Sequence, residues 1–231
     1  MKILINHLTR MREGRICVAG VDPRGRHVRP VTSSTHKLTR MMLTDRGGPF
    51  EIGAVLDLGE VAAVPNAPAT EDYRFSVTKT KRVKRLDGDE YFHLLDRVAH
   101  DDLESIFGPD LKRRKDTYAV DRGEGSASLG VLRVKRKVDL TTRYGRLRLK
   151  LNDGKATISL PVTDIRFVEE NHETIRNDVV EEVRWRMKSG VEVILMMGLT
   201  RPFQVKDDDD ERHWLQVNGI CLADRPLGSR P

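Results

Sequence analysis

The stretch that decides the fold is residues 146–160, RLRLKLNDGKATISL. Basic residues and leucines alternate along its first half, so that Arg146, Arg148 and Lys150 face one side of a strand and the leucines face the other. The Asp-Gly step in the middle is a strong signal for a tight hairpin turn. We therefore expect a β-hairpin with one basic face and one apolar face.

Comparable patterns predict further elements on both sides of this hairpin. Period-two alternation and turn residues predict strands or hairpins at residues 15–31, 54–61, 73–77, 129–138, 191–197 and 214–220. Helical spacing of apolar residues predicts helices at 89–98, 102–107 and 172–188, the last capped by Asn171. The polar, glycine-containing stretch 112–128 is interpreted as a linker.

These elements indicate a mainly β fold with minor α. Short strands, tight turns and a helix inserted between strands are typical of small barrels such as the OB-fold. A chain of 231 residues suits one large domain or two small ones. We expect two OB-like small β-barrels joined by a helical bridge, with residues 1–111 forming the N-terminal half and its bridge, and residues 112–231 the C-terminal half.

The charge balance favours a polyanionic partner. Lysine and arginine number 41 against 35 acidic residues, which gives a net charge of +6 and a pI near 9.4. No apolar run is long enough to cross a membrane, and the N-terminal apolar run is too short for a signal peptide. Cys17 and Cys221 read as two buried thiols in a reducing compartment. We expect a cytoplasmic protein with no cofactor.

Four groups of cations are candidates for holding a phosphate backbone. The first two lie on predicted strands and would form one basic face if those strands were neighbours: Arg133, Lys135 and Lys137, and Arg146, Arg148 and Lys150. The third is Lys79, Lys81 and Arg82 with Lys84 and Arg85, and the fourth is the stretch 112–115. The alternative is that these cations only keep an outer sheet face soluble.

Aromatic residues are scarce, at 5% of the chain. Single-strand binders stack bases on aromatic side chains, and Tyr73, Phe75 and Tyr144 lie next to basic segments. Arg29 and Arg201 each precede a proline near the end of a predicted strand. Each arginine could reach a ligand at a barrel mouth, or it could pair with backbone carbonyls at the strand exit.

The sequence contains none of the motifs that mark common enzyme sites. A phosphate loop, a zincin motif, a nucleophile elbow and a CxxC pair are all absent. Asp101 and Asp102 could attract a metal in a nuclease, although Asp102 reads better as a helix cap. The acidic run 207–211 is expected to be a mobile loop, with divalent-cation binding as the alternative. We expect no metal site and no catalytic residue.

Two segments at opposite ends of the chain carry a family resemblance. Near the N-terminus stand residues 8–11, LTRM, residues 14–20, GRICVAG, and residues 25–31, GRHVRPV; near the C-terminus stand 198–203, GLTRPF, and 213–220, HWLQVNGI. In this order they resemble the dual OB-containing domain family of bacteria. The resemblance implies two OB-like barrels, nucleic-acid binding and a place among genome-defence genes. The sequence departs from the family at His27, where the resemblance leads us to expect an aromatic residue.

The function that these observations favour is nucleic-acid binding by basic strand faces, with single strands or hybrids ahead of duplex. Two alternatives stay open. One is a metal-dependent nuclease with a site assembled across the two halves. The other is an interaction subunit of a larger complex, whose basic face meets an acidic protein.

Overall fold

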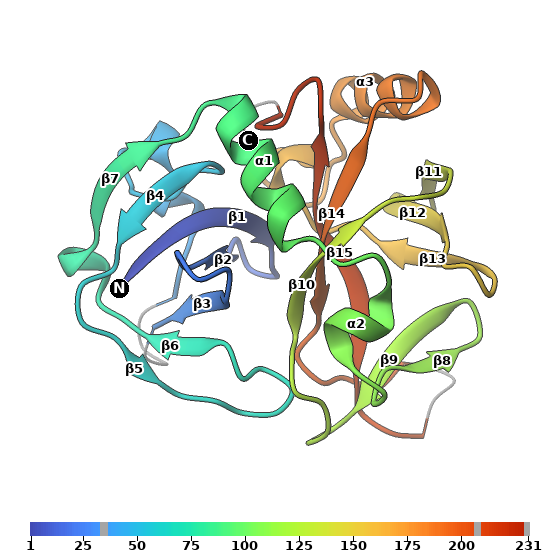
Figure 1. The fold of residues 1–231 in the computed structure, drawn as a ribbon, viewed down its shortest axis with the longest axis horizontal. Coiled ribbons are helices and arrows are strands. Elements are labelled where there is room, and N and C mark those ends of the chain that lie inside the picture. Colours follow the sequence, from blue (N-terminus) through green and yellow to red (C-terminus); the bar gives the residue numbers. More distant parts are fainter. Residues whose placement is uncertain (33–36, 206–208, 229–231) are drawn as a thin grey trace.

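A computed structural model describes residues 1–32, 37–205 and 209–228 of the protein. The chain is mainly β, and its strands form three curved sheets with short helices between them (Figure 1). The expectation of a β-rich fold with minor α is confirmed.

The N-terminal half is built on a seven-stranded sheet with the order β5-β6-β3-β2-β1-β4-β7. Its strands are β1 (Lys2–Arg10), β2 (Ile16–Val21), β3 (His27–Val31), β4 (Ala54–Asp57), β5 (Ala62–Ala63), β6 (Asp72–Arg74) and β7 (Lys81–Arg85). The predicted hairpin at 15–31 is confirmed as β2 and β3, which pair antiparallel. β3 pairs parallel with β6, so these two strands end side by side.

The C-terminal half contains a five-stranded sheet and a three-stranded sheet. The five-stranded sheet has the order β10-β14-β15-β9-β8, with β8 (Lys112–Arg114), β9 (Thr117–Asp121), β10 (Leu129–Arg133), β14 (Val193–Leu199) and β15 (Arg212–Leu222). The three-stranded sheet consists of β11 (Val138–Arg143), β12 (Arg146–Asn152) and β13 (Thr157–Pro161). The hairpin predicted around the Asp-Gly step is confirmed as β12 and β13.

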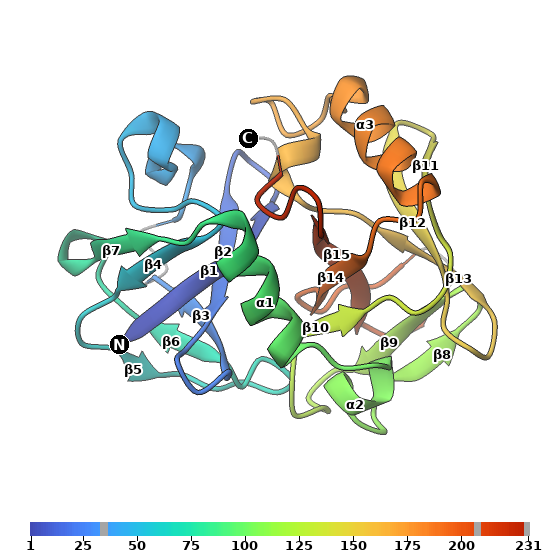
Figure 2. The same cartoon turned by 45° about the horizontal axis from the view of Figure 1, so that its top comes forward.

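Helices connect the sheets. They are α1 (Gly88–Val98), α2 (Leu103–Phe107) and α3 (Asn177–Lys188), with 3₁₀ turns η1 (Arg40–Met42), η2 (Thr44–Arg46), η3 (Val77–Lys79) and η4 (Ile165–Phe167). A capping box starts α1, and the Asp102 carboxylate caps α2. α1 lies between the seven-stranded sheet and β10 (Figure 2).

The two halves share the strands at their junction. Along β14, Ile194 and Met196 pack into the core of the N-terminal half, whereas Leu195 and Met197 pack into the core of the C-terminal half. Side chains alternate across a strand, so one sheet serves both cores. Every residue of β14 is buried for this reason. The division at residue 111 stays a prediction.

The structure corrects three predictions of local structure and adds one strand. The stretch 112–128 is not a linker throughout, because β8 and β9 lie in it. The strand predicted at 129–138 ends at Arg133. α3 begins at Asn177, and Asn171 instead accepts N–H groups of the turn at residues 173–174. β1, at the centre of its sheet, was not predicted.

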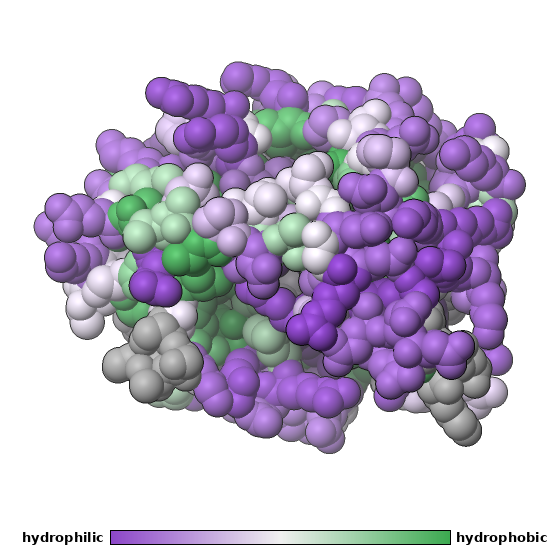
Figure 3. All heavy atoms as spheres, turned by 90° about the horizontal axis from the view of Figure 1, so that it is seen from below, coloured by the Kyte–Doolittle hydropathy of each residue, from purple (hydrophilic) through white to green (hydrophobic). Residues whose placement is uncertain are grey.

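The surface is largely hydrophilic on the face seen from below, with a smaller apolar area in the left half of the view (Figure 3). Of the helices in the described ranges, none is long and apolar enough to cross a membrane. Cys221 is buried, and its burial raises the pKa of the thiol to about 12; Cys17 is half-buried. The expectation of two buried thiols therefore holds for Cys221 only.

Candidate nucleic-acid interface

β12 has the two faces that its sequence predicts. Leu147, Leu149 and Leu151 are buried in the core of the C-terminal half. Arg146 and Lys150 on the opposite face are exposed, and Arg148 between them is half-buried. The apolar residues fix the register because a slip by one residue would bring the cations into the core.

The two neighbouring strands enlarge this basic face. β12 is the middle strand, and Arg143 of β11 lies directly opposite Arg146. The Arg148 guanidinium donates through Nε to Ser159 Oγ of β13 at 2.8 Å, which fixes its position on the sheet. We call the set Arg143, Arg146, Arg148 and Lys150 the β12 basic face. Arg143 was missed from the sequence, although its place before a Tyr-Gly turn signals that it pairs with the next strand.

The β12 basic face carries an excess of positive charge, although Asp139 of β11 lies directly opposite Lys150 and Asp116 lies near Arg148. No ion pair is formed by Arg143, Arg146 or Lys150 with any residue that the structure describes. Partial burial lowers the pKa of Arg148; the charge of Asp116 raises it, and the charges of Arg143 and Arg146 lower it. Burial and then Arg146 likewise lower the pKa of Arg10. Mutual repulsion of this kind favours binding of an anion.

Tyr144 projects from the tip of this face. It forms a two-residue turn with Gly145, and both residues have positive φ, at 50° and 67°, as a type I′ hairpin requires. A tyrosine in this conformation is uncommon. Its side chain is 87% exposed, and the Arg143 guanidinium lies 5.1 Å from the ring centroid. Of the three aromatic candidates, Tyr144 is therefore the one whose exposed ring lies beside the β12 basic face, where it can stack on a base. Phe75 is buried against Phe50, and Tyr73 is half-buried in β6.

The six strand cations do not share one face. Arg133 ends β10, in a different sheet from β12, and its guanidinium bonds to Asp96 and Asp101 at 2.9 and 2.7 Å. Lys135 pairs with Asp101 at 2.7 Å. Lys135 and Lys137 lie in the connection to β11 rather than on a strand. The expectation of one shared face fails because the chain changes sheets after residue 133.

The other two basic groups are also partly neutralised. Lys79 lies within 4.0 Å of Glu60, and Arg82 pairs with Glu51 at 2.9 Å. With the exposed Lys81, these residues lie on or beside β7, the outer edge of the N-terminal sheet and far from β12 (Figure 1). In the stretch 112–115, Lys112 pairs with Asp121 and Glu124. Charged residues at such an edge keep it from pairing with other strands.

The two Arg-Pro pairs meet on one carboxylate, that of Asp72. Arg29 Nε lies 2.6 Å from Asp72 Oδ1, and Arg201 Nη2 lies 2.8 Å from Asp72 Oδ2. Arg29 and Asp72 are buried, whereas about half of Arg201 is exposed. Neither of the two roles predicted for these arginines describes this arrangement. It joins the two halves of the chain and leaves Arg29 with no place on an exposed face.

The buried His7 and the half-buried His27 lie beside this cluster; the sequence marked His27 only as a departure from the family pattern and did not single out His7. The rings of His7 and His27 meet edge to face, with centroids 5.9 Å apart. Asn218 Nδ2 contacts His7 Nδ1 at 3.3 Å. His7 Nε2 and His27 Nδ1 are buried and have no hydrogen-bond partner in the described structure. Burial and the nearby His100 lower the pKa of His27 to about 4, and burial likewise lowers the pKa of His7.

These histidines predict that the protein loses stability on mild acidification. The unfolded chain binds the His27 proton below about pH 6.5, whereas the folded protein does not bind it until about pH 4. Stability should therefore fall as pH drops through this window, by at most about 3 kcal/mol because part of the ring is reachable by water. Urea titrations at several pH values measure the loss. In His27→Phe the loss should shrink, and a loss that begins only below pH 4 would contradict the role of His27.

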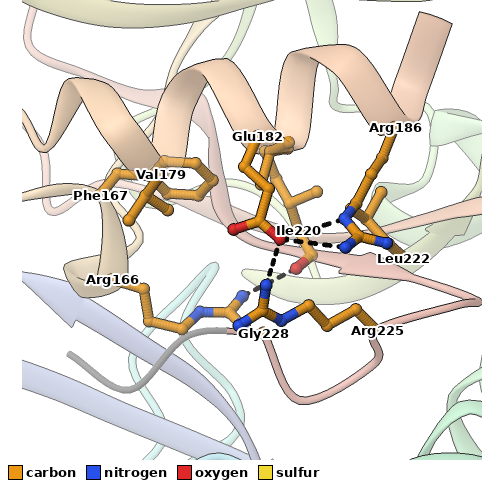
Figure 4. A pocket seen from close by; sticks show the side chains of 10 residues that line it. Arg166, Phe167, Val179, Glu182, Arg186, Ile220, Leu222, Arg225 and Gly228 are labelled. Atoms are coloured by element: carbon orange, nitrogen blue, oxygen red, sulfur yellow. Dashed lines mark hydrogen bonds and ion pairs between the residues drawn. The ribbon is translucent and has the colours of Figure 1, made fainter.

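A small hollow beneath α3 offers no room for a ligand. Arg166, Glu182 and Arg225 line it, and the Glu182 carboxylate pairs with Arg186 at 3.1 Å and with Arg225 (Figure 4). Its volume is about 20 Å³, enough for about one water molecule. Within residues 1–32, 37–205 and 209–228, no group of three or more potential ligands could hold a metal ion. Of the acidic run 207–211, residues 207 and 208 lie outside the described residues, and Asp210 and Glu211 pair with Arg212 and Arg122.

Comparisons with known proteins give only weak similarities. No family model matches the chain, and no curated protein matches it. Among solved structures, a murine DNA-binding protein bound with double-stranded DNA aligns over 96% of both chains, with 9% identity and a TM-score of 0.31. The HINb domain of p204 aligns over 94% of this chain and 95% of its own, with 9% identity and a TM-score of 0.36. The tetrameric p202 HIN2 aligns over 94% and 90%, with 8% identity and a TM-score of 0.32. Similarities this weak carry no argument about the fold or function of this chain.

Proposed function

We propose that the protein binds nucleic acid on the β12 basic face, with single strands or RNA–DNA hybrids ahead of duplex. The observation that carries the proposal is the contrast in charge pairing. Arg133, Lys135 and Arg82 are paired with carboxylates, whereas Arg143, Arg146 and Lys150 make no ion pair with the residues described around them. Cations that only keep a surface soluble need not gather on one sheet face in excess over its carboxylates, here Asp139 opposite Lys150. A row of them on a rigid sheet is suited to a phosphate backbone.

Tyr144 supports the preference for unpaired strands. A base can stack on an exposed aromatic ring only when it is not already stacked inside a duplex. The ring is held at the end of the row of cations by a two-residue turn, so a strand that follows β12 would place a base near it. From the sequence resemblance we also propose that the chain forms two OB-like barrels, belongs to the dual OB-containing family and acts in bacterial defence.

Replacing two exposed cations of the β12 basic face by glutamate should weaken nucleic-acid binding without unfolding the protein. In Arg146→Glu/Lys150→Glu we expect at least about tenfold weaker binding of a labelled single strand, because each lost phosphate contact removes counterion release. The parent protein should show a log–log salt slope of about −2 to −3, from three to four phosphates at about −0.7 each. Fluorescence anisotropy at several salt concentrations measures both quantities. Arg148 is unsuitable for this test because it also bonds to Ser159.

The matched control is Arg74→Glu/Lys81→Glu, which changes the net charge equally at exposed positions of β6 and β7 that form no ion pair with the residues described. Equal weakening by both double variants would show that net charge, rather than the β12 basic face, holds the strand. Tyr144→Ala should weaken single-strand binding and leave duplex binding unchanged. Cleavage of the strand with magnesium would favour the nuclease alternative, and equal competition by heparin at every oligonucleotide length would favour an acidic protein partner.

A further inference from the structure

A second site is open at the junction of the two halves. A hollow of about 290 Å³ lies between the β2–β3 turn and β6 on one side and α2 and the start of β10 on the other. This volume is at the lower end of small-molecule sites, which run from about 300 to 1,000 Å³. The hollow is separate from the β12 basic face, since β10 belongs to a different sheet from β12. A ligand of this hollow would therefore bind at a different site from the strand on the β12 basic face.

The walls of the hollow suit a flat ring. Tyr73 lines one side with a half-buried aromatic ring. Ile106 and Leu129, both buried aliphatic residues, line the other side. Gly130 lies between them, and a Cβ there would stand 2.0 Å from Ile106 Cγ2, so the wall is packed as closely as the backbone allows. A planar heterocycle can be enclosed between an aromatic face and aliphatic side chains.

His27 gives the hollow a hydrogen-bond donor. The imidazole is neutral because burial and His100 lower its pKa to about 4, so one ring nitrogen carries a proton and the other does not. Nδ1 is enclosed and has no partner in the described structure. A buried N–H without an acceptor is costly, so the proton belongs on Nε2, the nitrogen of the half-exposed part of the ring. His27 lines the hollow and therefore offers an N–H to a carbonyl or ring nitrogen of a ligand.

The remaining polar groups favour an anion at the rim. Arg26 lines the hollow, and Asp22 holds its guanidinium through Nε at 2.8 Å and Nη2 at 2.7 Å. Arg26 is 59% exposed, and its Nη1 has no partner among the residues described. The Glu71 carboxylate also lines the hollow and keeps its negative charge, but Ser128 and Leu129 bond to both of its oxygens, so an anion is expected at the Arg26 side rather than beside Glu71.

We propose that this hollow binds a nucleotide, with its base between Tyr73 and the aliphatic wall, a base acceptor on His27, and its phosphate at Arg26. The nucleotide can be a free nucleoside monophosphate or an unstacked unit of a strand. Both present the same ring and phosphate to the hollow. The ring and the donors together exclude ligands that lack either a flat acceptor edge or a negative charge.

Calorimetric titration with each of the four common ribonucleoside monophosphates, up to millimolar concentration, tests the free form. We expect saturable binding of at least one of them by the parent protein. Arg26→Met and Ala127→Phe, which fills the hollow from the segment that precedes β10, should each weaken that binding at least about tenfold. Arg24→Met is the matched control, because Arg24 is an exposed arginine of the same turn that does not line the hollow.

The strand form is tested with the same variants and a single-stranded oligonucleotide. If no monophosphate binds, weaker oligonucleotide binding by Arg26→Met and Ala127→Phe, but not by Arg24→Met, assigns the hollow to a unit of a strand. If neither ligand responds to Arg26→Met and Ala127→Phe, or if Arg24→Met has the same effect, the proposal is wrong. Arg146→Glu/Lys150→Glu should leave monophosphate binding unchanged, so failure here and failure of the β12 basic face are distinguishable. Circular dichroism shows that each variant is folded.

Discussion

Asp72→Ala should cost about 3–5 kcal/mol of folding free energy, the penalty typical of breaking a buried ion pair by removing one partner. Arg29 is buried against Asp72, with 2.6 Å between Nε and Oδ1, and its Nη2 already lacks a partner in the described part of the chain. An arginine does not lose its proton at any ordinary pH. The substitution therefore removes the carboxylate bonded to the Arg29 guanidinium and leaves only the charge of the neighbouring Glu71, which bonds to Ser128 and Leu129 instead. Urea unfolding of parent and variant measures the difference.

Asp72 has a second arginine partner, Arg201, whose removal should cost much less stability. Arg201→Ala removes the half-exposed arginine, whose Nη2 lies 2.8 Å from Asp72, and it should cost only about 1 kcal/mol because solvent screens this pair. Glu60→Ala removes an exposed carboxylate 4.0 Å from Lys79 and should cost less still. The double variant Arg29→Met/Asp72→Leu should recover most of the loss, since apolar residues can replace a buried pair. A loss below 1 kcal/mol in Asp72→Ala would show that the cluster is not a buried ion pair in solution.

Local sequence patterns correctly predicted the strands and helices that have one apolar face and one polar face. β12 alternates between leucine and cation, and α1 begins at a capping box, so the environment of each residue can be read from its neighbours. β1 was missed for the opposite reason. It is covered on both sides, the polar residues Asn6 and His7 are buried with its apolar ones, and a bulge between Ile5 and His7 shifts its register. A strand buried on both faces has no alternation to detect.

The candidate sites show the same limit. Arg146, Arg148 and Lys150 were found because one strand carries all of them. The meeting of Arg29 with Arg201 depends on contacts between opposite ends of the chain, and Asp72, which joins them, lies in neither motif. The sequence also could not show which cations are paired. In the sequence Arg133 is indistinguishable from the cations of β12. Asp96 and Asp101, which bond to it, come close to it only in the folded chain.

Leu149→Glu should destabilise the C-terminal half by about 5 kcal/mol or more, a large part of the whole stability of a typical domain. Leu149 is fully buried, with 0% of its surface exposed, in the core formed with Leu147 and Leu151. Removing a buried leucine side chain alone costs about 2–5 kcal/mol. The new carboxyl group would have to be buried uncharged, which raises its pKa and adds a further penalty at neutral pH. Thermal melts followed by circular dichroism measure the result.

An exposed position on the opposite face of the same strand provides the control. Arg146→Glu introduces the same residue on the outer face of β12, where it would lie opposite Arg143. We expect a change within about 1 kcal/mol, because the site is exposed and the new charge faces a cation. A large loss in Leu149→Glu with a small one in Arg146→Glu would establish the register that places the β12 basic face outward. If Leu149→Glu melts like the parent, the leucines do not face a core. The cations would then not form one exposed row, and the proposed interface would fail together with the register.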